Sequence, residues 1–278
     1  MDRLFLNIIK NALVEDIGSG DITSNATIHS AIHCKARFKM KESGIIAGLE
    51  VSKTAFSLLD DKIKFTNLYN DGDYVQIGSE VAIIEGAVKS ILSAERVALN
   101  FLQRMSGIAT ATSMYVEKVK KYKTIILDTR KTVPGIRVFD KWAVRLGGGQ
   151  NHREGLYDMI LIKDNHIIAC GSISNAIRLA QKNNENNYSI EVEVKNLNEL
   201  IESLKFDIQK ILLDNMSTDD LNEAVKIVNG KVSLEASGNI NINNVEEIAA
   251  TGVDFISIGK LTHSVSALDI SLNIEQLI

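Results

Sequence analysis

The sequence predicts an α/β protein in which a small α+β layer is followed by a parallel sheet covered by helices. Three observations support this prediction: an alternating strand near the start, a long amphipathic helix in the middle, and a regular βα rhythm after it. Strands that alternate with helices favour a parallel sheet with the helices outside, either a barrel or a doubly wound sheet.

The first part begins with an amphipathic helix at residues 1–18, whose acids and asparagines are unlike the apolar stretch of a signal peptide. The segment CKARFKM, residues 34–40, then alternates in character. Ala36, Phe38 and Met40 share one face and cations occupy the other, which predicts a half-exposed strand.

The rest of the first part is predicted to be short elements followed by one long helix. A short helix is expected at residues 51–59, and short strands broken by turn residues are expected between residues 63 and 88. A long amphipathic helix over residues 90–107 then leads into the second part.

The second part has six strand-like runs with helix-like stretches between them. The runs are TIILDT (124–129), DMILIK (158–163), IEVEV (190–194), KILLDN (210–215), VSLEAS (232–237) and FISIG (255–259). They end in polar residues or glycine, namely Thr129 or Arg130, Lys163, Glu193, Asp214, Ser237 and Gly259. Because α/β barrels build their sites at the carboxyl ends of the strands, these residues are predicted to ring one active-site mouth.

One neighbourhood of this mildly acidic protein is strongly basic. The net charge of −4 argues against a general nucleic-acid or membrane surface, so an affinity for anions must come from a local site. Between Thr129 and Lys163 there are seven lysines and arginines against three acids, and His152 lies among them. Guanidinium groups bind carboxylates and phosphates bidentately, which predicts a substrate with several anionic groups.

Two carboxylates, Glu193 and Asp214, close neighbouring strand-like runs. Such a pair suits Mg²⁺ together with phosphate oxygens, or the stabilisation of a developing cation. A glycosidase acid/base pair is an alternative, but the many cations speak against a neutral sugar as the substrate.

Two glycine-containing segments are predicted to bind phosphate. ASGNIN (236–241) is expected to be a strand, a Ser-Gly turn and a helix start, and SIGK (257–260) ends the next strand in a similar way. Backbone N–H groups at a helix start bind phosphate, and the last two loops of a barrel often do so. The glycines at 147–149 lack the GK[ST] ending of a Walker loop.

Cysteine usage and hydropathy predict a soluble, cytoplasmic protein. Cys34 and Cys170 are far apart and in no metal-ligand spacing, which fits buried free thiols in a reducing compartment. No run approaches the roughly 20 apolar residues of a membrane span.

The motifs of the chain, in their order and spacing, resemble the nicotinate-nucleotide pyrophosphorylase (carboxylating), or quinolinate phosphoribosyltransferase, family. The resemblance covers essentially the whole chain, and its most specific block runs from Asp128 to Ile167. The segments that carry it are EDIGSGDITS, AERVALNFLQRMSGIAT, DTRKTVPGIR, KWAVRLGGGQNHREGLYDMILIKDNHI, IEVEV, ILLDNM, LEASGNIN and ISIGKLTHS.

This resemblance implies an N-terminal α/β sandwich and an incomplete TIM-like α/β barrel. The sandwich would span residues 1–108, with the tail 267–278 returning to it, and the barrel would span residues 109–266 and carry the active site. The implied reaction combines quinolinate with phosphoribosyl pyrophosphate, with Mg²⁺ as cofactor, and yields nicotinate mononucleotide, pyrophosphate and CO₂ in de novo NAD biosynthesis. Homodimers or assemblies of dimers are implied as well.

The resemblance also implies residue roles. Arg130, His152 and Arg153 would bind quinolinate, with Arg96 reaching in from the neighbouring subunit. Lys131, Lys163, Glu193 and Asp214 would be catalytic, the two lysines between quinolinate and the phosphoribosyl group and the two acids near the ribose and Mg²⁺. Substrate contacts are further implied for Thr129, Ser237, Gly238, Asn239, Ile258, Gly259 and Lys260, of which the last six belong to the 5′-phosphate loops.

Three alternatives remain open at this point. The first is a paralogous phosphoribosyltransferase-like protein of molybdate-transport operons that acts on another heterocyclic acid. The second is a lyase that uses Lys163 as a Schiff-base amine. The third is a non-catalytic barrel that binds phosphorylated ligands.

Overall fold

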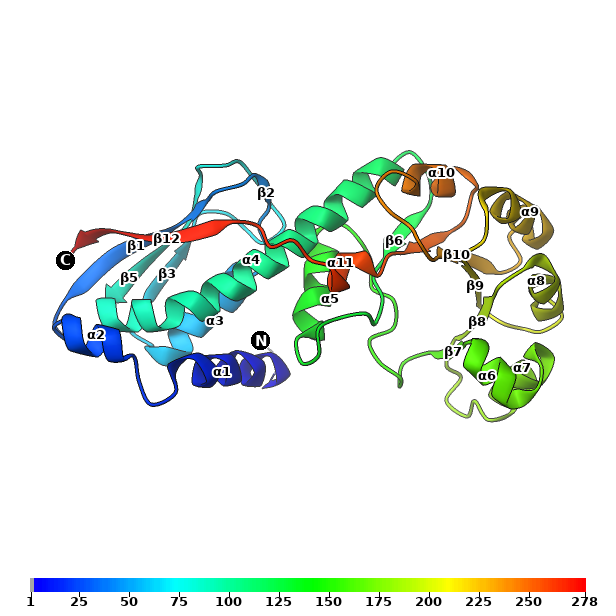
Figure 1. Cartoon of the computed structure of the whole chain (residues 1–278), viewed down its shortest axis with the longest axis horizontal. Coiled ribbons are helices and arrows are strands. Elements are labelled where there is room, and N and C mark those ends of the chain that lie inside the picture. The colour runs from blue at the N-terminus through cyan, green and yellow to red at the C-terminus, as the bar shows by residue number, and fades with distance from the viewer. Residues whose placement is uncertain (1–2) are drawn as a thin grey trace. The chain divides into compact units, whose positions relative to one another are not determined.

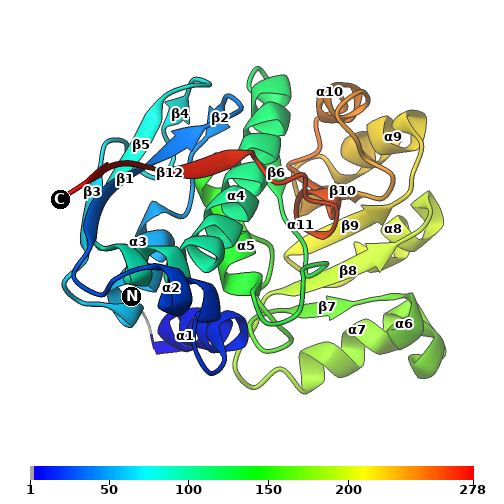
Figure 2. The same cartoon turned by 60° about the vertical axis from the view of Figure 1, so that its left-hand side comes forward.

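The computed structural model describes residues 3–278, which divide into two compact units (Figure 1, Figure 2). One unit contains the chain up to Ser113 together with Thr132–Gly148 and Ser264–Ile278, and the other contains Met114–Lys131 and Gly149–His263. Each unit has a sheet of its own, antiparallel in the first and parallel in the second. The predicted α/β fold class is therefore confirmed.

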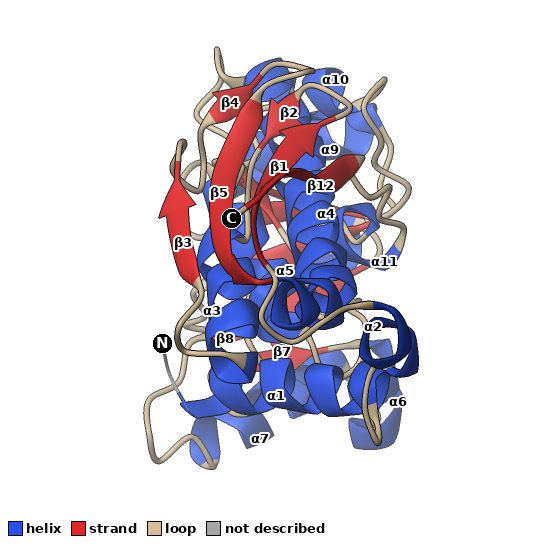
Figure 3. Ribbon diagram, turned by 90° about the vertical axis from the view of Figure 1, so that its left-hand side faces the viewer, coloured by secondary structure: helices blue, strands red, loops and turns tan. Residues whose placement is uncertain are grey.

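The first unit is built on a four-stranded antiparallel sheet in the order β12-β1-β5-β3 (Figure 3). Its strands are β1 (His33–Met40), β3 (Lys64–Asn67), β5 (Glu80–Ala87) and β12 (Ile270–Leu277), and β2 (Gly44–Ile45) pairs with β4 (Tyr74–Val75) in a small ribbon. β12 pairs with β1 along its length, so two segments far apart in the sequence lie side by side.

The alternation predicted for the first strand is confirmed in β1. Ala36, Phe38 and Met40 are fully buried, because side chains of one strand face repeat every second residue. The ring of Phe38 lies 6.1 Å from the ring of Phe56 and 6.2 Å from that of Phe65, measured between centroids. This face of the sheet therefore packs into the core of the first unit.

The helices of the first unit include α1 (Arg3–Ile17), α2 (Ile22–Thr27), α3 (Leu49–Leu59) and α5 (Arg137–Leu146). The predicted opening helix is confirmed from Arg3 onward, and its first two residues lie outside the described residues. Asp140 of α5 is fully buried and accepts hydrogen bonds from Nε and Nη2 of Arg104, at 2.8 and 2.9 Å.

The long central helix, α4 (Val88–Val119), is longer than predicted. The sequence prediction ended this helix at Gly107, but the helix continues through that glycine. A Cβ atom at Gly107 would lie 2.1 Å from the backbone oxygen of Ser266. Gly107 is therefore a point of close backbone approach, and its role is to make room for the neighbouring segment.

All six predicted strands of the second unit are confirmed as one parallel sheet. They are β6 (Ile125–Leu127), β7 (Ile160–Ile162), β8 (Ile190–Val194), β9 (Lys210–Asp214), β10 (Ser233–Ser237) and β11 (Phe255–Ser257). Their spatial order is β7-β8-β9-β10-β11-β6, so neighbours in sequence are neighbours in space except at β6. A doubly wound sheet would reverse direction in the middle, so this order is that of an incomplete barrel with β6 and β7 at its edges.

Helices follow the strands of the second unit, and those after β7, β8, β9 and β10 lie along the outer side of the sheet (Figure 1). They are α6 (Asp164–Cys170), α7 (Ile173–Lys182), α8 (Leu197–Ser203), α9 (Thr218–Val228), α10 (Val245–Ala250) and α11 (Lys260–His263). The side chains of Ser172, Asn196 and Ser217 cap α7, α8 and α9 by accepting a backbone N–H from the first turn. These caps fix where each helix begins after its strand.

Both cysteines are free thiols, Cys34 buried and Cys170 half-buried. Within residues 3–278, no helix combines the length and the apolar character needed to cross a membrane.

Candidate active site

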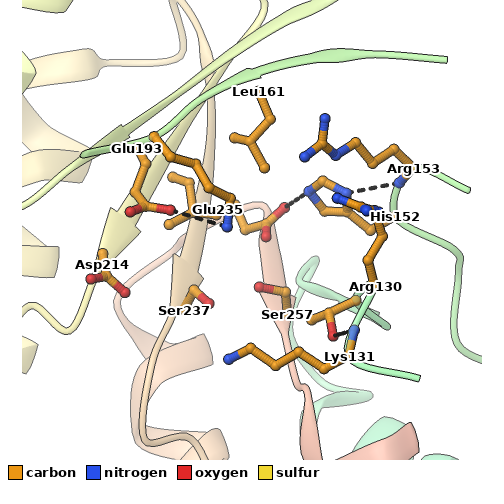
Figure 4. A pocket seen from close by; sticks show the side chains of 13 residues that line it. Arg130, Lys131, His152, Arg153, Leu161, Glu193, Asp214, Glu235, Ser237 and Ser257 are labelled. Carbon is orange, nitrogen blue, oxygen red and sulfur yellow. Dashed lines mark hydrogen bonds and ion pairs between the residues drawn. The ribbon is translucent and has the colours of Figure 1, made fainter. Parts of the chain in front are cut away.

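A pocket of about 320 Å³ lies at the carboxyl ends of the parallel strands (Figure 4). Its lining residues are Thr129, Arg130, Lys131, His152, Arg153, Leu161, Lys163, Glu193, Leu212, Asp214, Glu235, Ser237 and Ser257. Figure 4 shows Glu193 and Asp214 at one side of the pocket and Arg130, His152 and Arg153 at the other. The pocket therefore has an acidic side and a cationic side.

The pocket brings together most of the residues predicted from the sequence. The predicted residues that line it are Thr129, Arg130, Lys131, His152, Arg153, Lys163, Glu193, Asp214 and Ser237. The predicted residues outside its lining are Arg96, Gly238, Asn239, Ile258, Gly259 and Lys260. Arg96 is exposed on α4 of the first unit, whereas the other five follow β10 and β11 directly.

The cationic side is built around Arg130 and Arg153. The Nε atom of Arg130 is buried and has no hydrogen-bond partner among the described residues. Burial, and then the positive charge of Arg130, lower the pKa of Arg153 from its ordinary value. Two guanidinium groups that repel each other in one pocket, one with an unused buried donor, are suited to a ligand that carries carboxylates.

The His152 ring is held between the backbone N–H of Arg153 and two buried glutamates, Glu191 and Glu235. Its Nδ1 atom accepts a hydrogen bond from the Arg153 backbone N–H at 2.8 Å. Its Nε2 atom lies 2.9 Å from a carboxylate oxygen of Glu191 and 3.5 Å from one of Glu235, and both glutamates are fully buried. Asp128, also fully buried, accepts the backbone N–H of His152 at 2.8 Å and so holds this loop at the end of β6.

Lys210 supplies a positive charge beside the two buried carboxylates of Glu191 and Glu235. Its ammonium lies 2.6 Å from Glu235 and 3.8 Å from Glu191. Burial, and then the charge of Glu191, raise the pKa of Glu235. The ligand atoms of His152, Glu191 and Glu235 lie within 4.8 Å of one another, which is close enough for a metal ion. The Lys210 ammonium already contacts both carboxylates, so this cluster has a cation of its own.

Glu191, Lys210 and Glu235 were not among the predicted site residues, which on β8, β9 and β10 were all taken from the strand ends and the loops that follow them. The signal was present, because each residue lies two or four positions before a predicted strand-end residue, namely Glu193, Asp214 and Ser237. Side chains of one strand face repeat every second residue, so a charged residue at that spacing in an apolar run points toward the same interior.

The acidic side pairs Glu193 with a lysine and places Asp214 next to it. The Lys163 ammonium lies 3.6 Å from a carboxylate oxygen of Glu193. Burial raises the pKa of Glu193, the charge of Lys163 opposes this, and the charge of Asp214 adds to it. His166 accepts the Lys163 backbone N–H at 2.9 Å and so helps to fix the turn from which this lysine projects. A cation bound at these carboxylates would relieve the repulsion between them, so the pair fits Mg²⁺.

The Glu193→Gln substitution is expected to raise the melting temperature of the metal-free protein at neutral pH. Because the folded-state pKa of this carboxyl is raised, the folded protein takes up its proton more readily than the unfolded chain does. Ionised Glu193 therefore lowers stability at neutral pH, and the gain of the glutamine variant should vanish as the pH falls through the raised pKa. Thermal unfolding over a pH series measures this gain. A lower melting temperature at neutral pH would mean that the pair with Lys163 outweighs burial.

The segment after β10 differs from its prediction. A helix start was predicted directly after Ser237 and Gly238, but α10 begins only at Val245. The intervening loop has Gly238 at φ +96° and Asn239 at φ +52°. Successive N–H groups in such turns can form an anion-binding concavity, so a phosphate role for this loop depends on its turns rather than on a helix terminus.

Lys131 is positioned by the segment after β11. The Thr262 hydroxyl donates to the Lys131 backbone oxygen at 2.9 Å. A Cβ atom at Gly259 would lie 2.9 Å from the Cδ atom of Lys131, so this glycine makes room for the lysine stem. The second predicted phosphate segment and a predicted catalytic lysine are therefore in contact.

Comparison with known families matches almost the whole chain. The N-terminal domain family of quinolinate phosphoribosyl transferase matches residues 21–106, and the C-terminal domain family of the same enzyme matches residues 108–273.

Individual relatives agree with these matches. The chain is 45% identical to the decarboxylating quinolinate phosphoribosyltransferase 1 of Nicotiana glauca, over 96% of this chain and 81% of that protein. It is 42% identical to a probable carboxylating nicotinate-nucleotide pyrophosphorylase of Bacillus subtilis, over 96% of this chain and 92% of that one. The solved nicotinate-nucleotide pyrophosphorylase of Ehrlichia chaffeensis superposes with a TM-score of 0.94 at 43% identity, covering 99% of this chain and 100% of that chain.

Proposed function

Because this chain belongs to the quinolinate phosphoribosyltransferase family, we propose that it transfers a phosphoribosyl group from phosphoribosyl pyrophosphate to quinolinate. The products are nicotinate mononucleotide, pyrophosphate and CO₂, and the reaction is a pentosyl transfer in de novo NAD biosynthesis. The observation that carries the proposal is the pair Arg130 and Arg153 in one pocket, with the buried Nε atom of Arg130 unused.

Quinolinate binds at the cationic side. Its two adjacent carboxylates meet the guanidinium groups of Arg130 and Arg153, whose planar forks match carboxylate geometry. His152, held by Glu191 and by the Arg153 backbone, defines the edge of this subsite.

Phosphoribosyl transfer takes place between the two sides of the pocket. The pyridine nitrogen attacks C1′ of the ribose, and the bond from C1′ to the pyrophosphate oxygen breaks with its electron pair leaving on pyrophosphate. Lys131 and Lys163 stabilise the negative charge that leaves, and Glu193 and Asp214 stabilise the positive charge that develops at C1′. Glu193 and Asp214 would also hold Mg²⁺ with the phosphate oxygens, and this ion, when bound, neutralises the leaving pyrophosphate.

Loss of CO₂ follows from the charge on the alkylated ring. The bond between C2 and its carboxylate breaks, CO₂ leaves, and the electron pair stays at C2 until a proton is taken up there. Thr129 and Ser237 at the pocket wall contact the substrates. Gly238 and Asn239 after β10 hold the 5′-phosphate together with Ile258, Gly259 and Lys260 after β11.

The assembly and location predicted from the sequence also belong to this proposal. We expect a homodimer, or an assembly of dimers, in which Arg96 of one subunit reaches the quinolinate subsite of the other; Arg96 is exposed on α4, which supports this role. The division into a sandwich (1–108 with 267–278) and a barrel (109–266) stays a prediction. The pairing of β12 with β1 supports the return of the tail, whereas Thr132–Gly148 belongs to the first compact unit. The cytoplasmic location stays a prediction.

The test is the release of CO₂ and pyrophosphate by the purified protein given quinolinate, phosphoribosyl pyrophosphate and Mg²⁺, with nicotinate as a parallel substrate. Turnover with quinolinate and none with nicotinate is expected, because only quinolinate presents two carboxylates to the two arginines. Folded protein that turns over neither substrate would refute the proposal and would direct the search to other heterocyclic acids.

A further inference from the structure

The carboxylate Asp214 and the loop after β10 are joined by one side chain, that of Asn215. Asn215 follows β9 directly and has φ +54°, a left-handed conformation that few non-glycine residues other than asparagine adopt readily. Its backbone N–H donates to the Ser237 oxygen at 2.8 Å, which ties the end of β9 to the end of β10.

The side-chain amide of Asn215 makes two further hydrogen bonds with opposite roles. Its Nδ2 donates to Asp214 Oδ1 at 3.0 Å, and its Oδ1 accepts from Asn239 Nδ2 at 2.9 Å. An ionised carboxylate can only accept, so Nδ2 must face Asp214 and Oδ1 must face Asn239. The two ends of the amide are therefore not interchangeable, and the orientation of Asn215 is set by both partners.

The backbone of Gly238 packs directly against the Asn215 side-chain amide. A Cβ atom at Gly238 would lie 2.2 Å from Oδ1 and 2.4 Å from Cγ of Asn215. Gly238 also has φ +96°, so both its conformation and its neighbour require glycine. The turn of Gly238 and Asn239 thus takes its shape from the Asn215 side chain.

We propose that Asn215 is a positioning residue that sets the distance between the Asp214 carboxylate and the Gly238–Asn239 loop. This inference rests on the proposed function, in which Asp214 serves the ribose and pyrophosphate end of the substrate and the loop serves its 5′-phosphate. Phosphoribosyl pyrophosphate must contact both at once, whereas quinolinate contacts neither. Asn215 therefore acts on the affinity for phosphoribosyl pyrophosphate and has no part in quinolinate binding.

The test uses Asn215→Gly, which keeps the left-handed backbone accessible and removes the amide. Asn229 provides a matched control, because it is also an exposed asparagine in the left-handed region, at φ +45°. It is the C-cap of α9, whereas Asn215 follows β9 at the carboxyl end of the parallel sheet. Dissociation constants for phosphoribosyl pyrophosphate with Mg²⁺ and for quinolinate are measured separately by titration calorimetry on each full-length protein.

Loss of the two amide hydrogen bonds in Asn215→Gly is expected to weaken binding of phosphoribosyl pyrophosphate about tenfold and to leave quinolinate binding unchanged. Asn229→Gly should change neither constant. An equal loss for both ligands in Asn215→Gly, or equal behaviour of the two variants, would overturn the proposal. These outcomes differ from a failure of the proposed function, which would appear as wild-type protein that binds neither substrate or turns neither over.

A second measurement reports the contact itself. Gly238→Ala should weaken binding of phosphoribosyl pyrophosphate strongly in the wild-type background, because the new methyl group would meet the Asn215 amide. In the Asn215→Gly background that clash is gone, so the same alanine should cost less affinity. Additive effects of the two substitutions would contradict a positioning role for Asn215.

Discussion

Replacing Arg130 with methionine is expected to weaken quinolinate binding roughly 100-fold, since two charge-assisted hydrogen bonds to one carboxylate are lost. Arg130 lines the pocket, and its buried Nε atom has no partner among the described residues, so the donor is available to a ligand. The dissociation constant for quinolinate, measured by calorimetry, checks this prediction. Arg130→Lys should restore only part of the affinity, because a lysine keeps the charge and loses the planar fork.

The stability of the Arg130 variant separates a binding role from a structural one. The charge of Arg130 lowers the pKa of Arg153, so the two cations repel each other in the unliganded protein. Arg130→Met should therefore keep or raise the melting temperature while it loses quinolinate. Arg3→Met, at an exposed arginine outside the pocket, is the control. An unchanged affinity for quinolinate in Arg130→Met would refute the assignment of this arginine.

Replacing Lys210 with methionine is expected to destabilise the protein by about 3–5 kcal/mol, because it leaves two buried carboxylates without their ammonium. Lys210 contacts Glu235 at 2.6 Å and Glu191 at 3.8 Å, and its ammonium also lies 4.3 Å from the centroid of the Phe255 ring. Thermal unfolding should show a fall in melting temperature of roughly 10 °C or more.

The pH dependence and a double variant make the Lys210 prediction specific. The pKa of Glu235 is already raised by burial, so the folded state binds that proton more readily than the unfolded chain. Without Lys210 this preference grows, and the deficit of Lys210→Met should shrink as the pH falls. The double variant Lys210→Met/Glu235→Gln should be more stable than Lys210→Met alone, since one of the two carboxylates left without the Lys210 ammonium is then neutral. A double variant that is less stable would show that the charges are not coupled.

Much of the fold was predictable because it depends on local periodicity. The alternation around Phe38 predicted β1, and the six apolar runs predicted β6–β11, since strand and helix patterns are properties of neighbouring residues. Gly107 misled the prediction of α4, because glycine is both a common helix terminator and a means of close packing. Only the position of Ser266 distinguishes the two roles, and that position is not a local property.

The cationic and acidic residues of the site were predicted as a set because the carboxyl ends of parallel strands lie at the same edge of the sheet. Arg130, Lys163 and Glu193 line one pocket as that rule requires. Glu191, Lys210 and Glu235 were not predicted, because only the strand ends were considered, although their even spacing from those ends was visible in the sequence. Their significance comes from distances between different strands.

The sequence by itself determined the family, the order of the elements and the chemical character of the pocket, because these follow from motifs, periodicity and the placement of charges along the chain. The tertiary structure alone decided that Lys210 pairs with Glu235 and Glu191, and that Asn215 joins Asp214 to the loop at Gly238. The physical reason is that burial and pairing depend on which strands become neighbours, and long-range contacts of this kind leave no periodic signal in the sequence.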